Sequence, residues 1–126
     1  MSEIKVVSLK ASGNVPVVEV FFGQANWGSY ATWLYDKNGK NPVLVSEGVN
    51  TDEVEDIAEI GDLNMLDGKM LFWRLRTARF DESSGGRFYM KVTISQGEEL
   101  LHKSEYKGEF NSLTQDAIGL VRFAIS

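Results

Sequence analysis

Several residue types that carry chemistry are scarce in this chain of 126 residues. The sequence contains no cysteine, one histidine and two prolines. Without cysteine there is no disulfide framework, no thiolate nucleophile and no cysteine-ligated zinc. A zinc site made of histidines is also excluded, because such sites need three or four histidine or cysteine ligands. We therefore expect no bound metal and no cofactor.

Long apolar runs are also absent. No stretch approaches the roughly 20 apolar residues of a membrane-spanning helix. The first residues, Met1 to Lys5, lack the basic start and apolar stretch of a signal peptide. We expect a cytoplasmic protein, or one exported without a cleaved signal. The length predicts a single domain over residues 1–126.

Basic residues are outnumbered, which gives a formal net charge of −5. This balance argues against nucleic acid as a partner, because neutralisation of phosphate usually supplies most of that affinity. Residues 47–68 carry eight acidic side chains and no basic one, whereas residues 69–91 carry six basic side chains. The two segments could lie side by side and pair, or each could be a solvated surface.

Strand-like runs alternate with turn signals every ten residues or so, which predicts an all-β fold. Asn38-Gly39 between two apolar runs is a strong hairpin signal and predicts a type I′ turn. After Gly97, a three-residue loop would align Leu100, His102, Ser104 and Tyr106 with the apolar face of the preceding strand. The expected strands cover residues 3–10, 15–22, 29–36, 42–46, 69–78, 87–96, 100–110 and 117–125.

The segment 47–68 is the hardest to interpret, and we expect at most one short helical turn within 52–60. The whole pattern predicts a single antiparallel β-sandwich of about eight strands. It resembles the general pattern of immunoglobulin-like, C2-like and lectin-like sandwiches, although a fold alone does not give a function.

Catalytic machinery is sparse. His102 is the one available base for a serine nucleophile, and its place in an alternating strand favours a structural role. Paired carboxylates could act as in glycosidases, but the acidic segment looks solvated. Acidic residues such as Asp52, Asp56, Glu59 and Asp62 could instead form a calcium site. We expect that the protein is not an enzyme. A calcium-dependent membrane-binding module is the least favoured alternative function.

Two groups of residues are candidates for binding. Trp27 lies in a polar connection with Gln24 and Asn26, where a ring beside amides could bind a sugar or could fold back over the sandwich end. Most other aromatic residues are expected in the core, among them Trp33, Phe72, Trp73, Phe88 and Phe123.

The second group is the arginine row. Arg74 and Arg76 project from one face of a predicted strand and Arg79 follows, a pattern suited to docking a protein partner or to pairing with a neighbouring strand. The sequence thus predicts a non-catalytic module that binds a protein partner, with a lectin-like carbohydrate-binding protein as the alternative. Exposed strand edges near Pro16 or Pro42 would also allow a homo-oligomer.

Overall fold

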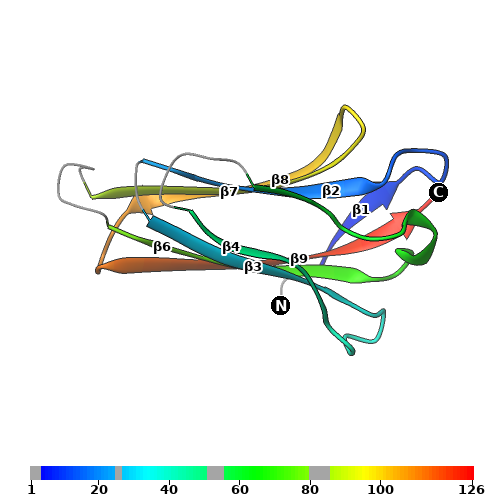
Figure 1. The fold of residues 1–126 in the computed structure, drawn as a ribbon, viewed down its shortest axis with the longest axis horizontal. Coiled ribbons are helices and arrows are strands. Elements are labelled where there is room, and N and C mark those ends of the chain that lie inside the picture. The colour runs from blue at the N-terminus through cyan, green and yellow to red at the C-terminus, as the bar shows by residue number, and fades with distance from the viewer. Residues whose placement is uncertain (1–3, 25–26, 51–55, 80–85) are drawn as a thin grey trace.

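The computed structural model describes residues 4–24, 27–50, 56–79 and 86–126. Within these residues the chain forms nine strands and one turn of 3-10 helix, arranged in two layers (Figure 1). The elements are β1 (Lys5–Leu9), β2 (Pro16–Gly23), β3 (Trp27–Tyr35), β4 (Val43–Asn50), β5 (Asp56–Glu59), η1 (Leu63–Met65), β6 (Met70–Ala78), β7 (Arg87–Gln96), β8 (Glu99–Glu109) and β9 (Thr114–Ile125).

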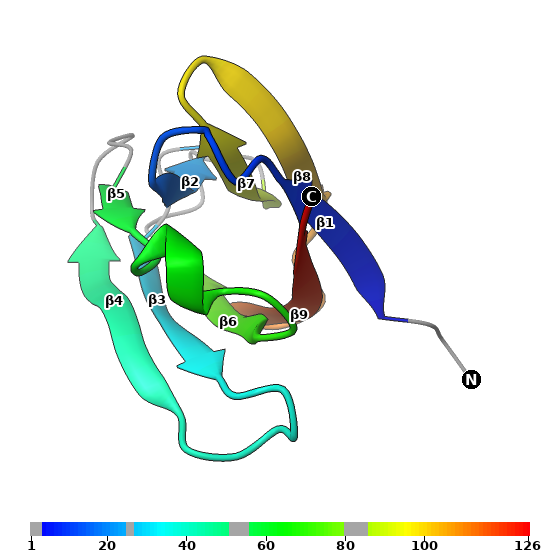
Figure 2. The same ribbon diagram turned by 90° about the vertical axis from the view of Figure 1, so that its right-hand side faces the viewer.

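The two layers are a five-stranded sheet in the order β1-β9-β6-β3-β4 and a four-stranded sheet in the order β5-β2-β7-β8. Viewed from one end, the five-stranded sheet follows a curve from β4 to β1 beneath the other sheet (Figure 2). The predicted all-β sandwich is therefore confirmed. One pair departs from the antiparallel prediction, because β1 and β9 run parallel.

The core lies between the sheets and follows from period-two alternation along each strand. On β6, for example, Leu71, Trp73 and Leu75 are buried while Arg74 and Arg76 are exposed. The predicted inward face of β7 is confirmed for Met90, Val92 and Ile94, each 0% exposed. Further members of the core are Val7, Leu9, Val18, Val20, Phe22, Leu34, Ile60, Leu63, Leu66, Val121 and Phe123.

The hairpin between β3 and β4 forms as predicted, but its turn differs. Positive φ angles occur at Gly39 and Asn41, not at both Asn38 and Gly39 as a type I′ turn requires. The cause is Asp36, whose carboxylate accepts the backbone N–H groups of Asn38 and Lys40, each at 2.9 Å. These bonds stabilise a longer loop, and they hold the pKa of the Asp36 carboxyl below its usual value.

The hairpin between β7 and β8 has a shorter turn than predicted. Gln96 pairs with Glu99, so two residues connect the strands, and a bulge near Leu101 restores the register. His102, Ser104 and Tyr106 consequently lie opposite Ile94, Val92 and Met90, as expected. Leu100 was expected on the core face but is 57% exposed. Leu101 packs against the core in its place.

The segment 47–68 is more regular than the sequence indicates. Residues 47–50 continue β4, and Asp56–Glu59 form the short strand β5 beside β2. Residues 56–59 form no helical turn, because all four pair with β2, and the turn of 3-10 helix lies at Leu63–Met65, outside the predicted range 52–60. Asp52 lies outside the described residues. No helix in the described ranges is long and apolar enough to cross a membrane.

The four strands at the edges of the sheets differ in length and charge. β1 has five residues, and β5 has four, of which Asp56 and Glu59 are acidic. β8 is long but carries alternating Lys and Glu from Lys103 onward. In β4 the register shifts at Val45, so a bulge interrupts that edge. Short length, charge and bulges all oppose pairing with a further strand.

Candidate functional site

The outer face of the five-stranded sheet is unusually apolar for a solvent-facing surface. Because alternate residues of a strand face opposite ways, the neighbours of the buried residues on β3, β6, β9 and β4 point outward. Cross-strand register places four of them in one row across the sheet, which we name the apolar band. The band consists of Leu44, Trp33, Phe72 and Leu120. Nearby, Val49 is 72% exposed and Ile118 is 63% exposed.

Trp33 and Phe72 were expected in the core, and this prediction is wrong. Both lie half-buried on the outer face, since Leu34 and Trp73, their neighbours in sequence, occupy the inward positions. The two rings are 5.7 Å apart between centroids, and Tyr35 meets Phe72 edge-on at 6.3 Å. The Arg74 guanidinium lies over the Trp33 ring, 5.6 Å from its centroid. This contact favours a position of Arg74 beside the band.

A groove of about 770 Å³ runs beside the apolar band along β3. We name it the β3 groove. The small side chains of Ser29 and Ala31 form its floor. Glu47 and Val49 of β4 form one wall. The other wall consists of Arg74 and Arg76 of β6 together with Asp116 of β9.

The two arginines of this wall differ in their pairing. Arg76 forms a bidentate pair with Asp116, with Nε to Oδ1 at 2.6 Å and Nη2 to Oδ2 at 2.9 Å. The pair raises the pKa of Arg76 and lowers the pKa of Asp116. The acidic segment 47–68 was considered as the partner of the basic segment, but Arg76 takes its partner from β9. Among the described residues, Arg74 has no carboxylate within ion-pair distance.

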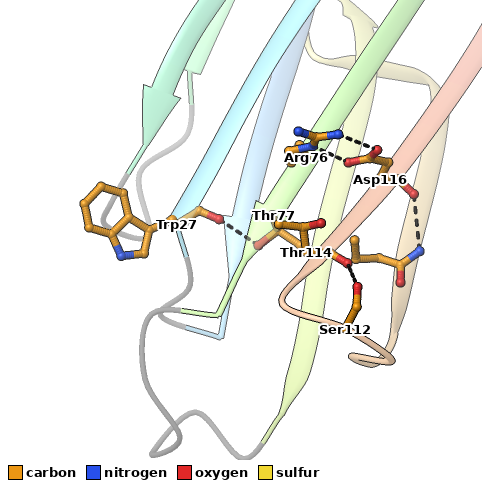
Figure 3. Close-up of polar contacts among 7 residues, drawn as sticks. Trp27, Arg76, Thr77, Ser112, Thr114 and Asp116 are labelled. Carbon is orange, nitrogen blue, oxygen red and sulfur yellow. Dashed lines mark hydrogen bonds and ion pairs between the residues drawn. The ribbon is translucent and has the colours of Figure 1, made fainter.

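Trp27 begins β3 and is 44% exposed. Its backbone carbonyl accepts a bond from the Thr77 hydroxyl at 2.7 Å, while its ring points away from Arg76 and Asp116 (Figure 3). The alternation of β3 puts Trp27 on the same face as Ser29 and Ala31, at the end of the sheet.

The structure does not bring Gln24 and Trp27 to one site. Gln24 lines a separate, smaller hollow of about 280 Å³ that also contains Arg87, Tyr89 and Lys107. Asn26 lies outside the described residues. Arg79 lies beyond the end of β6, where its guanidinium neighbours Gly86, so it does not line the groove with Arg74 and Arg76.

The outer face of the four-stranded sheet is different in character. Lys91 lies over the Phe21 ring at 5.2 Å, and the Tyr89 hydroxyl donates to Glu105 at 2.6 Å. Lys103 pairs with the same Glu105 at 3.3 Å. On this face Lys91 and Lys103 each have a partner, Phe21 and Glu105 respectively.

The single histidine lies on the inner face of β8. Burial, followed by the charge of Lys5, lowers the pKa of His102, and its Nε2 is 2.8 Å from the Ser104 hydroxyl. Within the described part of the chain, no carboxylate contacts His102 to complete a catalytic triad. No group of three or more His, Cys, Asp or Glu side chains in those residues could hold a metal ion.

The groove contains residues that sequence patterns did not single out. Ser29 and Ala31 could have been found from the alternation of their strand, which places every second residue on one face. Asp116 and Glu47 could not, because their positions depend on the order and register of strands distant in sequence. No family model matches the chain, and neither a curated protein nor a solved structure matches it.

Proposed function

We propose that this chain is a non-catalytic binding module that docks a protein partner on the outer face of its five-stranded sheet. The observation that supports this most is the difference between the two outer faces. On one face, Lys103 pairs with Glu105 and Lys91 lies over the Phe21 ring. The other exposes the apolar band and an arginine with no carboxylate partner among the described residues.

The composition of this face supports a protein partner. Trp, Tyr and Arg are the residues that contribute most often to the binding energy of protein interfaces. Here Trp33, Tyr35 and Arg74 lie together with Phe72. Exposed apolar patches on soluble domains commonly mark interaction sites. Since the strand edges are short, charged or bulged, the outer face of the five-stranded sheet is the better docking surface.

Affinity capture from the source cells, followed by mass spectrometry, tests this proposal. The variant is Trp33→Ser with Arg74→Glu, and the matched control is Phe21→Ser with Lys91→Glu on the opposite face. Each variant replaces one aromatic residue and reverses one cation on an outer face, and circular dichroism checks their folding. We expect a specific partner with wild type and with the control variant only. Equal capture by the face variant would contradict the proposal.

A carbohydrate ligand is the second candidate, and the exposed ring of Trp27 favours it. Aromatic rings beside polar groups bind the apolar faces of sugars. A glycan array with wild type and with Trp27→Ala tests this. Selective binding that disappears in Trp27→Ala would support a lectin, whereas an array without binding would eliminate this candidate.

A further inference from the structure

We infer that the β3 groove binds an extended, acidic peptide segment of the partner, and that Arg74 receives its carboxylate. This inference rests on the proposed function, because it names the chemistry that the same face would recognise. Its basis is a difference between neighbouring cations. Asp116 forms both hydrogen bonds of its bidentate pair with Arg76, whereas Arg74 feels the charge of Asp116 but forms no ion pair within the described residues.

Arg74 already contacts an aromatic ring before a ligand arrives. Its guanidinium lies 5.6 Å from the Trp33 ring centroid, and the Phe72 ring lies 5.7 Å from that ring, tilted by 32°. A planar guanidinium beside a ring can still present N–H groups along its edge, where a carboxylate can bind with two hydrogen bonds. Contact with the ring favours affinity, because it reduces the side-chain freedom that Arg74 loses on binding.

The groove has the dimensions of a single extended chain. Its walls stand on β4 and β6, which are separated by β3 alone and are thus about 10 Å apart. Along the floor, Ser29 and Ala31 are two residues apart, which corresponds to about 7 Å. Alternate side chains of an extended peptide have the same spacing, so two of them can occupy the space above these small residues.

Glu47 on the opposite wall would orient the bound peptide. It lies across Ala31 from Arg74 and has no ion-pair partner among the described residues. A peptide carboxylate is attracted to the Arg74 side and repelled from the Glu47 side. Replacing Glu47 with Gln should therefore strengthen the binding of an acidic peptide, an effect opposite to that of changing Arg74.

Selection from a displayed library of random short peptides against the immobilised full chain provides the test. With wild type we expect enriched peptides that carry Asp or Glu within two positions of an apolar residue. With Arg74→Glu this preference should disappear, and with the control Lys91→Glu on the other sheet it should persist. Enrichment without an acidic preference, or no enrichment at all, would overturn the inference.

Calorimetry with one selected peptide then tests the contact itself. Arg74→Glu should weaken binding about tenfold, and a peptide with Lys in place of its acidic residue should restore binding to that variant. Glu47→Gln should bind the acidic peptide more tightly than wild type. Absence of the charge-swap rescue would show that Arg74 does not contact the carboxylate.

The two proposals can fail separately. If the face variant loses its cellular partner but the library gives no acidic preference, the face binds a protein through other chemistry and only this inference fails. If the face variant retains its partner, the proposed function fails, whatever the library gives.

Discussion

Trp73 forms the centre of the core, and a glycine allows it to fit. The ring is 1% exposed, and its Nε1 donates to the Tyr106 hydroxyl at 3.1 Å. Gly119 pairs with Trp73 across β6 and β9, and a Cβ atom at position 119 would overlap the indole ring. Overfilling a packed core costs free energy because the neighbouring side chains have nowhere to move.

We therefore expect Gly119→Ala to lower the free energy of unfolding by about 1–3 kcal/mol. Urea denaturation measures this, with Gly108→Ala on β8 of the other sheet as the matched control. At position 108 an added Cβ would meet its nearest atom, in the Phe88 ring, at 3.4 Å, which is an ordinary contact. Equal effects of the two substitutions would mean that the indole ring does not occupy the space above Gly119.

Two tyrosines should make the stability of the fold depend on pH in the alkaline range. Burial, with hydrogen bonds to Asp56 and Glu105, raises the pKa of Tyr30 and of Tyr89 to about 12 in each case. In the unfolded chain these groups lose their protons near pH 10, which is two pH units earlier. Between pH 10 and 12 the unfolded state therefore binds fewer protons, and stability falls as the pH rises.

The urea midpoint should consequently decrease from pH 9.5 to pH 11.5, more than in a variant with Tyr30→Phe and Tyr89→Phe. Absorbance of the phenolate follows the titration in parallel. If both proteins lose stability equally over this range, the two hydroxyls are not responsible for the effect.

At the scale of strands, the sequence predicts which segments form strands better than it predicts the order and register of those strands. Alternation alone gives the faces of β6 and β7, because each strand has one wet side and one dry side. Alternation does not show which of two adjacent aromatic residues, such as Phe72 and Trp73, faces the core, since either choice places an apolar side chain inward. Alternation does not predict the β3 groove either, because Glu47, Ala31 and Arg74 become neighbours only through the order of the strands in the sheet.

The bulge in β8 gives a direct comparison of sequence and structure. The sequence predicts Leu100 on the core face, whereas the structure places Leu101 there. Leu101→Ala should lower the free energy of unfolding by about 1–3 kcal/mol, and Leu100→Ala should change it by less than about 0.5 kcal/mol. Chemical denaturation of the two variants checks this, and the reverse order would place the hairpin in the predicted register without a bulge.

For the molecule as a whole, the two ends of the chain are joined in one sheet. β1 pairs only with β9, in parallel, and contributes Val7 and Leu9 to the core at 2% and 0% exposure. These side chains lie beside Phe123, which would otherwise lose part of its cover. The sandwich is therefore complete only when its first strand has docked on its last.

We expect Val7→Ala with Leu9→Ala to remove much of the stability of the whole fold. Each truncation should lower the free energy of unfolding by about 2–4 kcal/mol, a large part of the roughly 5–15 kcal/mol typical of a domain. The control is Val6→Ala with Ser8→Ala on the same strand, since Val6 is 54% exposed and Ser8 also points outward. Thermal and urea denaturation should show one cooperative transition, shifted strongly in the first variant and little in the control. If the first variant unfolds at nearly the wild-type midpoint, β1 is peripheral to the core. If its transition instead splits in two, β1 docks on a sandwich that is already stable without it.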